Sequence, residues 1–152
     1  MIPKLRGGIC ACTKRSKKTL AGGGLMEAYE FLDVEAELVS LIKARVRVAA
    51  STILPKAKPT EHVLVIRVGG TANQLTDQPM VTFIASSDTW PKAAALGKLL
   101  RQRLMSVTRF GEHPVYRVRE VGGLSRSPDP DTGDPRYQLT VEFKLRGSTP
   151  PE

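Results

Sequence analysis

The chain has 152 residues, enough for one domain with its own core, and its 41% apolar and 25% charged residues are ordinary for a soluble globular protein. The net charge is +8, but residues 1–25 hold six basic side chains and no acid, so the other 17 basic and 15 acidic residues leave only +2. The high isoelectric point therefore does not indicate a nucleic-acid-binding domain, and one Trp, three Tyr and four Phe offer few platforms for stacking bases. No apolar run approaches the ~20 residues that span a bilayer, so we expect no membrane partner.

Residues 1–25 carry only positive charge and show no helical or strand period, which is typical of a disordered segment. Two interpretations stay open. The segment is either a basic arm that contacts an acidic partner, or a leader included by assigning the start of translation too early, with the natural start at Met26. We favour the second. We expect a single domain over residues 26–147 and a loose C-terminus over residues 148–152.

Two cysteines, Cys10 and Cys12, lie in the N-terminal segment. A structural zinc site needs four ligands, and His62 and His113 are distant in the sequence. We therefore expect free thiols in a reducing cytosol, no metal site and no cofactor.

The first half of the domain predicts a helix and a hairpin. Residues 33–48 place apolar side chains at helical spacing after Asp33, whose carboxylate can cap the helix. After a proline-containing linker, residues 62–68 and 79–85 form nearly continuous apolar strands, a pattern typical of strands covered on both faces. A glycine pair opens the segment 69–78 between them, which we expect to be a ten-residue loop.

The second half predicts another helix and another hairpin. Residues 89–107 have an apolar stripe at helical spacing, followed by a polar, half-exposed strand at 115–121 and a long polar loop at 122–135. Residues 136–146 alternate strictly between apolar and polar, so one face contacts a core, the other contacts water or a partner, and the strand offers an exposed edge for pairing. The expected fold is α+β in the order α-β-β-α-β-β, a four-stranded sheet with two helices packed on one face.

The turn between the second strand and the second helix is the first place to look for catalysis. It has neither the closely spaced glycines of a phosphate loop nor the G-x-S-x-G of a serine hydrolase around Ser86 and Ser87. We expect it to cap the helix through Ser87, Asp88 or Thr89, and we expect no enzyme activity. Trp90 at this corner is expected to be partly buried or to anchor an interface.

The segment DPDTGD, residues 129–134, has carboxylates at alternate positions, as calcium loops do. Its sixth and twelfth positions hold Asp134 and Thr140 instead of the Gly and Glu of an EF-hand, so we favour a simple turn.

The last two strands carry basic residues that allow either a DNA-facing strip or cross-strand ion pairs with Glu120 and Glu142, and we favour the pairs. These basic residues are Arg117, Arg119, Arg136, Lys144 and Arg146.

Taken together, these segments resemble the tail terminator proteins of long-tailed (siphovirus) actinobacteriophages. The resemblance covers residues 33–147 and is carried by VLVIRVGGT, LTDQPMVTFIASSDTWPKAAALGKLLRQRL, VYRVREVGG and DPDTGDPRYQLTVEFKLRG. Its markers are a strand ending in R-V-G-G, a second strand that leads into an Ala/Leu-rich helix, and a D-P-R-Y-x-x-x-V strand near the end.

The resemblance implies a small α/β virion protein that caps the finished tail tube as a ring, with hexameric symmetry in this family. Such a ring ends tube polymerisation and presents a surface to the head-side connector. Its partners would be copies of itself, the major tail tube protein, the connector protein, and genomic DNA that passes through the lumen without sequence readout. It would be located at the head-proximal end of the tail and in the host cytoplasm during assembly, and it would have no catalytic residues.

We expect the two loops and the Trp90 corner to contact neighbouring subunits or tube proteins. The candidate interface residues are Thr71, Asn73, Asp77, Trp90, Arg126, Asp129, Asp131 and Arg136. Two alternatives stay open: another head–tail joining protein, such as a connector or stopper, and a small nucleic-acid-binding protein that uses the basic arm.

Overall fold

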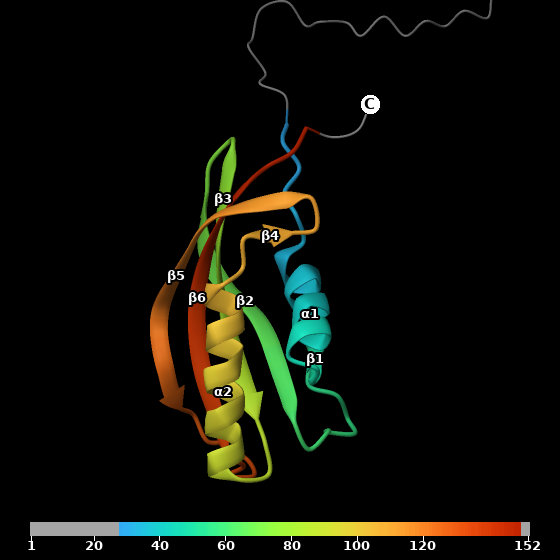
Figure 1. Cartoon of the computed structure of the whole chain (residues 1–152), viewed down its shortest axis with the longest axis vertical. Coiled ribbons are helices and arrows are strands. Elements are labelled where there is room, and N and C mark those ends of the chain that lie inside the picture. Colours follow the sequence, from blue (N-terminus) through green and yellow to red (C-terminus); the bar gives the residue numbers. More distant parts are fainter. Residues whose placement is uncertain (1–27, 150–152) are drawn as a thin grey trace, which may run out of the picture.

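A computed structural model describes residues 28–149 as a curled sheet, resembling half a barrel, with two helices packed on one of its faces (Figure 1). The Met26 start, the cysteines and the basic arm lie outside the described residues. In chain order the elements are α1 (Val34–Arg45), β1 (Ala49–Ser51), β2 (His62–Ala72), β3 (Thr76–Ser86), α2 (Trp90–Met105), β4 (Arg109–Phe110), β5 (His113–Arg126) and β6 (Arg136–Arg146).

The predicted four-stranded sheet in the order α-β-β-α-β-β is wrong. The described residues form six strands in the spatial order β1-β2-β3-β6-β5-β4, and the chain order is α-β-β-β-α-β-β-β. β1 runs parallel to β2 and the other neighbours are antiparallel, so the sheet is mixed. β1 has three residues and β4 has two, too short for either to show a period in the sequence.

Both helices begin where their capping side chains predict. Asp33 accepts a hydrogen bond from the backbone N–H of Ala36, and Thr89 accepts one from that of Lys92. Thr89 is therefore the cap among the three residues considered for α2. Each helix ends earlier than predicted, because the last apolar residues of the stripe follow the helix and pack in the turn after it.

The predicted ten-residue loop at 69–78 is wrong, because both strands extend into it. β2 and β3 are paired up to Ala72 and Asp77, and the side-chain oxygen of Asn73 accepts hydrogen bonds from the N–H groups of Leu75 and Thr76 to close a tight turn. The glycine pair lies at a register shift in β2, and Gly70 has a φ of 122°, a conformation open to glycine. The glycines bend the strand rather than end it.

The second hairpin differs from its prediction in the same way. β5 extends to Arg126, through the glycines expected to open a loop at 122–135, and three register shifts divide its pairing with β6. The bounds of β6 agree with the predicted strand at 136–146. However, β6 lies between β3 and β5 at the centre of the sheet, so the expectation that it offers a free edge is wrong.

The core lies between the helices and one face of the sheet. Val34, Leu38 and Ile42 of α1 and Leu96, Leu100 and Leu104 of α2 pack against inward residues of the central strands. The inward strand residues include Val63, Val65, Val81, Phe83, Leu139, Val141, Phe143 and Leu145, each 2% exposed or less. Their alternation leaves the intervening residues on the opposite face, which no described helix or strand covers (Figure 1).

Candidate functional site

The sheet face opposite the helices, which we call the open face, is apolar over β2 and β3. Leu64, Ile66 and Ile84 alternate with core residues and are only half-buried, although their sequence pattern predicted cover on both faces. Val68, in β2 at its register shift, is 54% exposed. Apolar side chains exposed together on one face mark a surface that contacts another molecule.

The open face is cationic over β5 and β6. The single carboxylate of Glu142 receives Arg119 at 3.2 Å and Arg117 at 4.0 Å. Lys144 and Arg146 have no carboxylate within 4.0 Å among residues 28–149. The predicted cross-strand pairs therefore form in part, and positive charge is left over at the β6 end.

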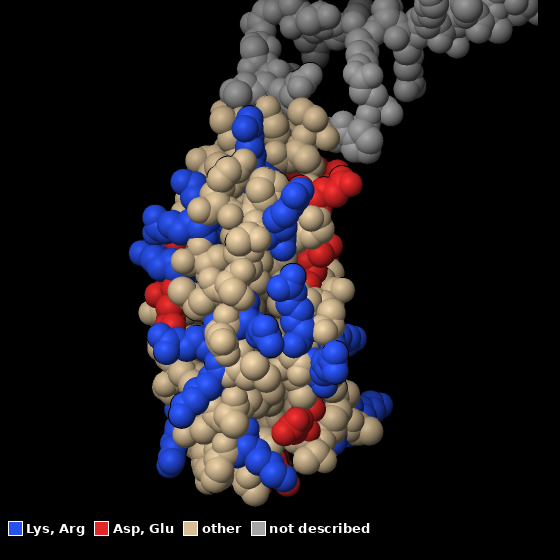
Figure 2. Space-filling model, in the orientation of Figure 1, with Lys and Arg blue, Asp and Glu red and all other residues tan. Residues whose placement is uncertain are grey.

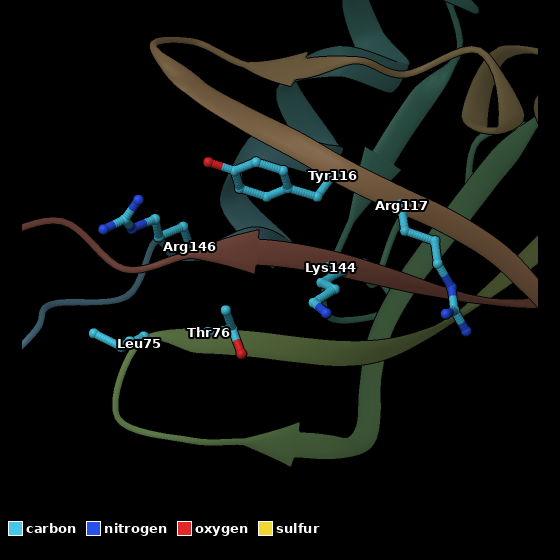
Figure 3. A pocket seen from close by; sticks show the side chains of 6 residues that line it. All are labelled: Leu75, Thr76, Tyr116, Arg117, Lys144 and Arg146. Atoms are coloured by element: carbon cyan, nitrogen blue, oxygen red, sulfur yellow. The ribbon is translucent and has the colours of Figure 1, made fainter.

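A groove of about 540 Å³ lies at this cationic end, and we call it the β6 groove (Figure 3). Lys144 and Arg146 extend from β6, Tyr116 reaches over from β5, and Leu75 lies on the other side at the hairpin turn. Tyr116 is 58% exposed and Leu75 is 40% exposed. The groove thus combines apolar walls with charged ends; its lining is Leu75, Thr76, Tyr116, Arg117, Lys144 and Arg146.

Trp90 anchors a second cluster at the other end of the sheet. Its ring meets that of Tyr137 edge to face at 6.0 Å between centroids. The Arg126 guanidinium lies 4.8 Å from the centroid of the Trp90 ring, and its Nε donates to the Tyr137 hydroxyl at 3.2 Å. Trp90 is half-buried, and Trp, Tyr and Arg are the residues most enriched at interface centres.

The acidic turn at 129–134 lies beside this cluster and is held by cations of the same chain. Asp129 contacts the guanidinium of Arg136 at 3.3 Å, and Asp134 accepts from the ammonium of Lys58 at 2.8 Å. The backbone N–H of Asp131, followed by the charge of Arg136, lowers the pKa of Asp129, and the hydrogen bond from Lys58 lowers the pKa of Asp134. This arrangement is that of a closed turn, with the carboxylates of Asp129 and Asp134 already paired.

The eight predicted interface residues fall into two groups at opposite ends of the sheet. Trp90, Arg126, Asp129, Asp131 and Arg136 gather at the end where β3 and β6 pair through Ser86 and Arg136. Thr71, Asn73 and Asp77 lie at the end where Asp77 pairs with Leu145.

The residues of this second group differ in exposure. Thr71 is exposed on β2 and Asn73 forms the turn. Asp77 is 2% exposed, and its carboxylate pairs with Arg67 at 2.9 Å, so it stabilises the fold.

Ser86 and Ser87, the serines considered for catalysis, lie at the end of the sheet away from His113. Ser86 donates to the carbonyl oxygen of His62, and Ser87 donates to Asp88. His113 begins β5 at the opposite end, since its neighbour Val115 pairs with Leu145. The described residues therefore do not bring Ser86 or Ser87 together with His113.

His62 is the one histidine of the described region that the fold buries. It is 1% exposed, its Nε2 lies 2.9 Å from the Oγ of Ser51, and its Nδ1 has no hydrogen-bond partner. The Ser51 hydroxyl itself donates to the carbonyl oxygen of Ile53. Burial, and then the charge of Lys58, lowers the pKa of His62, so the neutral ring is the stable form.

The residues that line the β6 groove were missed as a site by sequence reasoning. Arg117, Lys144 and Arg146 were noted as basic, but nothing in the sequence says which cation receives the single carboxylate of Glu142. Tyr116 lies at a register shift of β5, and that irregularity points its ring over the groove (Figure 3).

Charge is distributed unevenly on the helix side as well. Figure 2 shows Lys and Arg side chains over α2 and the adjoining strand edge, and acidic side chains beside the start of α1. α2 holds four basic residues and no acid, while residues 28–42 hold four acids and no base. The molecule therefore presents surfaces of opposite sign.

Within residues 28–149, no three His, Cys, Asp or Glu side chains are arranged to hold a metal ion, and neither helix has the length and apolarity to cross a membrane. No protein-family model matches this chain, and no curated protein is similar to it.

Proposed function

We propose that this chain is a virion assembly protein of a long-tailed phage, a tail terminator that caps the tail tube as a ring and joins the tail to the head-side connector. The observation that supports this most is the open face, which exposes apolar side chains on β2 and, on β6, cations that have no carboxylate partner among residues 28–149. A face of this kind is suited to contact with another protein subunit.

Ring assembly requires two different, complementary surfaces on every subunit, because the contacts are head-to-tail. The two sides of this subunit differ in that way: one is covered by helices and the other is open sheet. Pairing through sheet edges is less suited to the fold, because the edge strands β1 and β4 have only three and two residues. Beyond these short strands, β5 is irregular and carries arginines, and the side chain of Glu35 accepts the N–H of Arg67 on β2.

The two ends of the sheet are available for axial partners in such a ring. One end carries the Asn73 turn, and the other carries the Trp90 cluster with the segment 127–135. We propose that these ends face the tube protein and the connector, while the sides contact neighbouring copies.

The test is to polymerise the tail tube protein encoded by the same genome with and without this chain, and to measure tube lengths by negative-stain electron microscopy. We expect shorter tubes with a ring at one end. Tubes of unchanged length with bare ends would refute the proposal.

A parallel measurement tests the nucleic-acid-binding alternative. Retention of a DNA duplex is measured at two salt concentrations for the full chain and for the chain without residues 1–25. A DNA-binding protein that uses its arm loses retention with the arm and with salt, because its affinity comes from displaced counterions. The ring protein stops tube growth with or without the arm.

A further inference from the structure

We propose that the β6 groove receives the acidic start of α1 from a second copy of this chain. This inference rests on the proposed ring and names the surfaces that build it. The β6 groove and the start of α1 carry opposite charge and lie on opposite faces of the subunit.

The β6 groove supplies the positive partner. Lys144 and Arg146 have no carboxylate within 4.0 Å in the described chain, and Arg117 reaches Glu142 only at 4.0 Å. Tyr116 and Leu75 add apolar walls between these charges (Figure 3). A groove with free cations and apolar walls fits an acidic polypeptide better than a bare phosphate, which makes no use of apolar surface.

The start of α1 supplies the negative partner. Glu30 and Asp33 are exposed, Glu37 follows one turn later, and no basic residue lies between Glu30 and Lys43. The side chains of Glu30 and Glu37 make no hydrogen bond or ion pair with any residue in the range 28–149. Unpaired acids on one face and unpaired cations on the other make the subunit complementary to a copy of itself.

The positions of the two surfaces favour a ring over a filament. The backbone of Glu30 pairs with Ser148, and Gly147 donates to the carbonyl oxygen of Leu75, so the start of α1 and the β6 groove lie at the same end of the sheet. They occupy opposite faces, because Lys144 alternates with Phe143 and Leu145, which contact the helices. Because both contact surfaces lie at the same end of the sheet, each added copy lies beside the previous one rather than above it. Copies placed side by side in this way can close into a ring.

The experiment reverses charge on each surface of the full chain. One variant carries Lys144→Glu and Arg146→Glu, and the other carries Glu30→Lys and Glu37→Lys. The matched control carries Lys98→Glu and Arg103→Glu on the exposed side of α2, which changes the charge equally away from the groove. Oligomeric state is measured by size-exclusion chromatography with light scattering, and a thermal melt of each variant verifies folding.

Each reversed variant is expected to lose the ring, with an apparent dissociation constant raised on the order of 100-fold by like-charge contacts, while the α2 control keeps it. Combining all four substitutions of the two surfaces in one chain is expected to restore the ring. An equimolar mixture of the two reversed variants is expected to do the same for a ring with an even number of subunits, because every contact then pairs opposite charges.

The other outcomes overturn the inference. If wild type and both reversed variants all form the ring and stop tube growth, the β6 groove is not the contact and the proposed function stands. If groove reversal abolishes retention of a DNA duplex but leaves the ring intact, the groove is a nucleic-acid site. If the wild type is monomeric and leaves tubes unchanged, the proposed function fails as well.

Discussion

Replacing Phe110 with Ala tests whether β4, which the sequence did not reveal, is part of the core. The Phe110 ring is 2% exposed and meets the buried Phe143 ring edge to face at 5.5 Å between centroids. Buried Phe→Ala substitutions cost about 3–5 kcal/mol, of which the aromatic pair contributes roughly 0.5–1.5 kcal/mol. Since β4 is held to β5 by only two residue pairs, the substitution should also release that strand.

The assay is urea unfolding of the full chain at one fixed protein concentration, so that self-association does not shift the midpoint between variants. Met105→Ala is the control, because Met105 is 44% exposed near the end of α2 and its loss should change stability by less than about 0.5 kcal/mol. A double-mutant cycle with Phe110→Leu and Phe143→Leu isolates the ring contact. A cost below about 1 kcal/mol for Phe110→Ala would refute the packing described for β4.

Gly70, Asp77 and His62 each provide a further test of the fold. Gly70→Ala should lower the melting temperature markedly, because the backbone φ of 122° is strained for any residue with a side chain and the new Cβ would meet the backbone oxygen of Gln78. The control, Gly123→Ala, has room for a Cβ and should change the melting temperature little. Asp77→Ala should reduce the urea unfolding free energy by about 1–3 kcal/mol, because it removes the partner of a half-exposed arginine; an unchanged value would contradict the pairing. The unfolding free energy should fall as the pH drops below 6.5, the ordinary pKa of histidine. In that range the imidazole of His62 is protonated in the unfolded chain, whereas burial lowers its pKa in the folded protein and keeps it neutral. A His62→Asn variant with the same pH dependence of stability would refute this.

The elements that the sequence predicted well are those whose pattern is long and local. β6 was predicted with the correct bounds, because five apolar residues alternate with polar ones over its length. The cap of α1 was predicted at Asp33, and that of α2 was narrowed to three residues including Thr89, because both side chains act on backbone N–H groups within three residues.

The errors arise where long-range pairing decides the structure. The glycine pair at 69–70 has the sequence of a loop, but in a curled sheet it forms an irregularity within β2. β1 and β4 exist because residues distant in the chain lie beside them, and three and two residues carry no period. Strand number and sheet order therefore could not be obtained from patterns along the chain.

The candidate site shows the same division. The sequence identified Trp90, Arg126 and Arg136 as candidates by residue type, and the structure places them at one end of the sheet. The β6 groove could not be identified, because it depends on which cation lies near Glu142 and on the irregular pairing that orients Tyr116. Both depend on register, which a single sequence does not specify for a strand with several shifts.

Sedimentation velocity of the full chain over a wide concentration range tests directly whether this protein closes into a ring through unlike surfaces. We expect one discrete oligomer whose mass stays constant once it forms, because a closed ring leaves no free contact. A monomer at every concentration, or a mass that keeps growing with concentration as in an open filament, would contradict it.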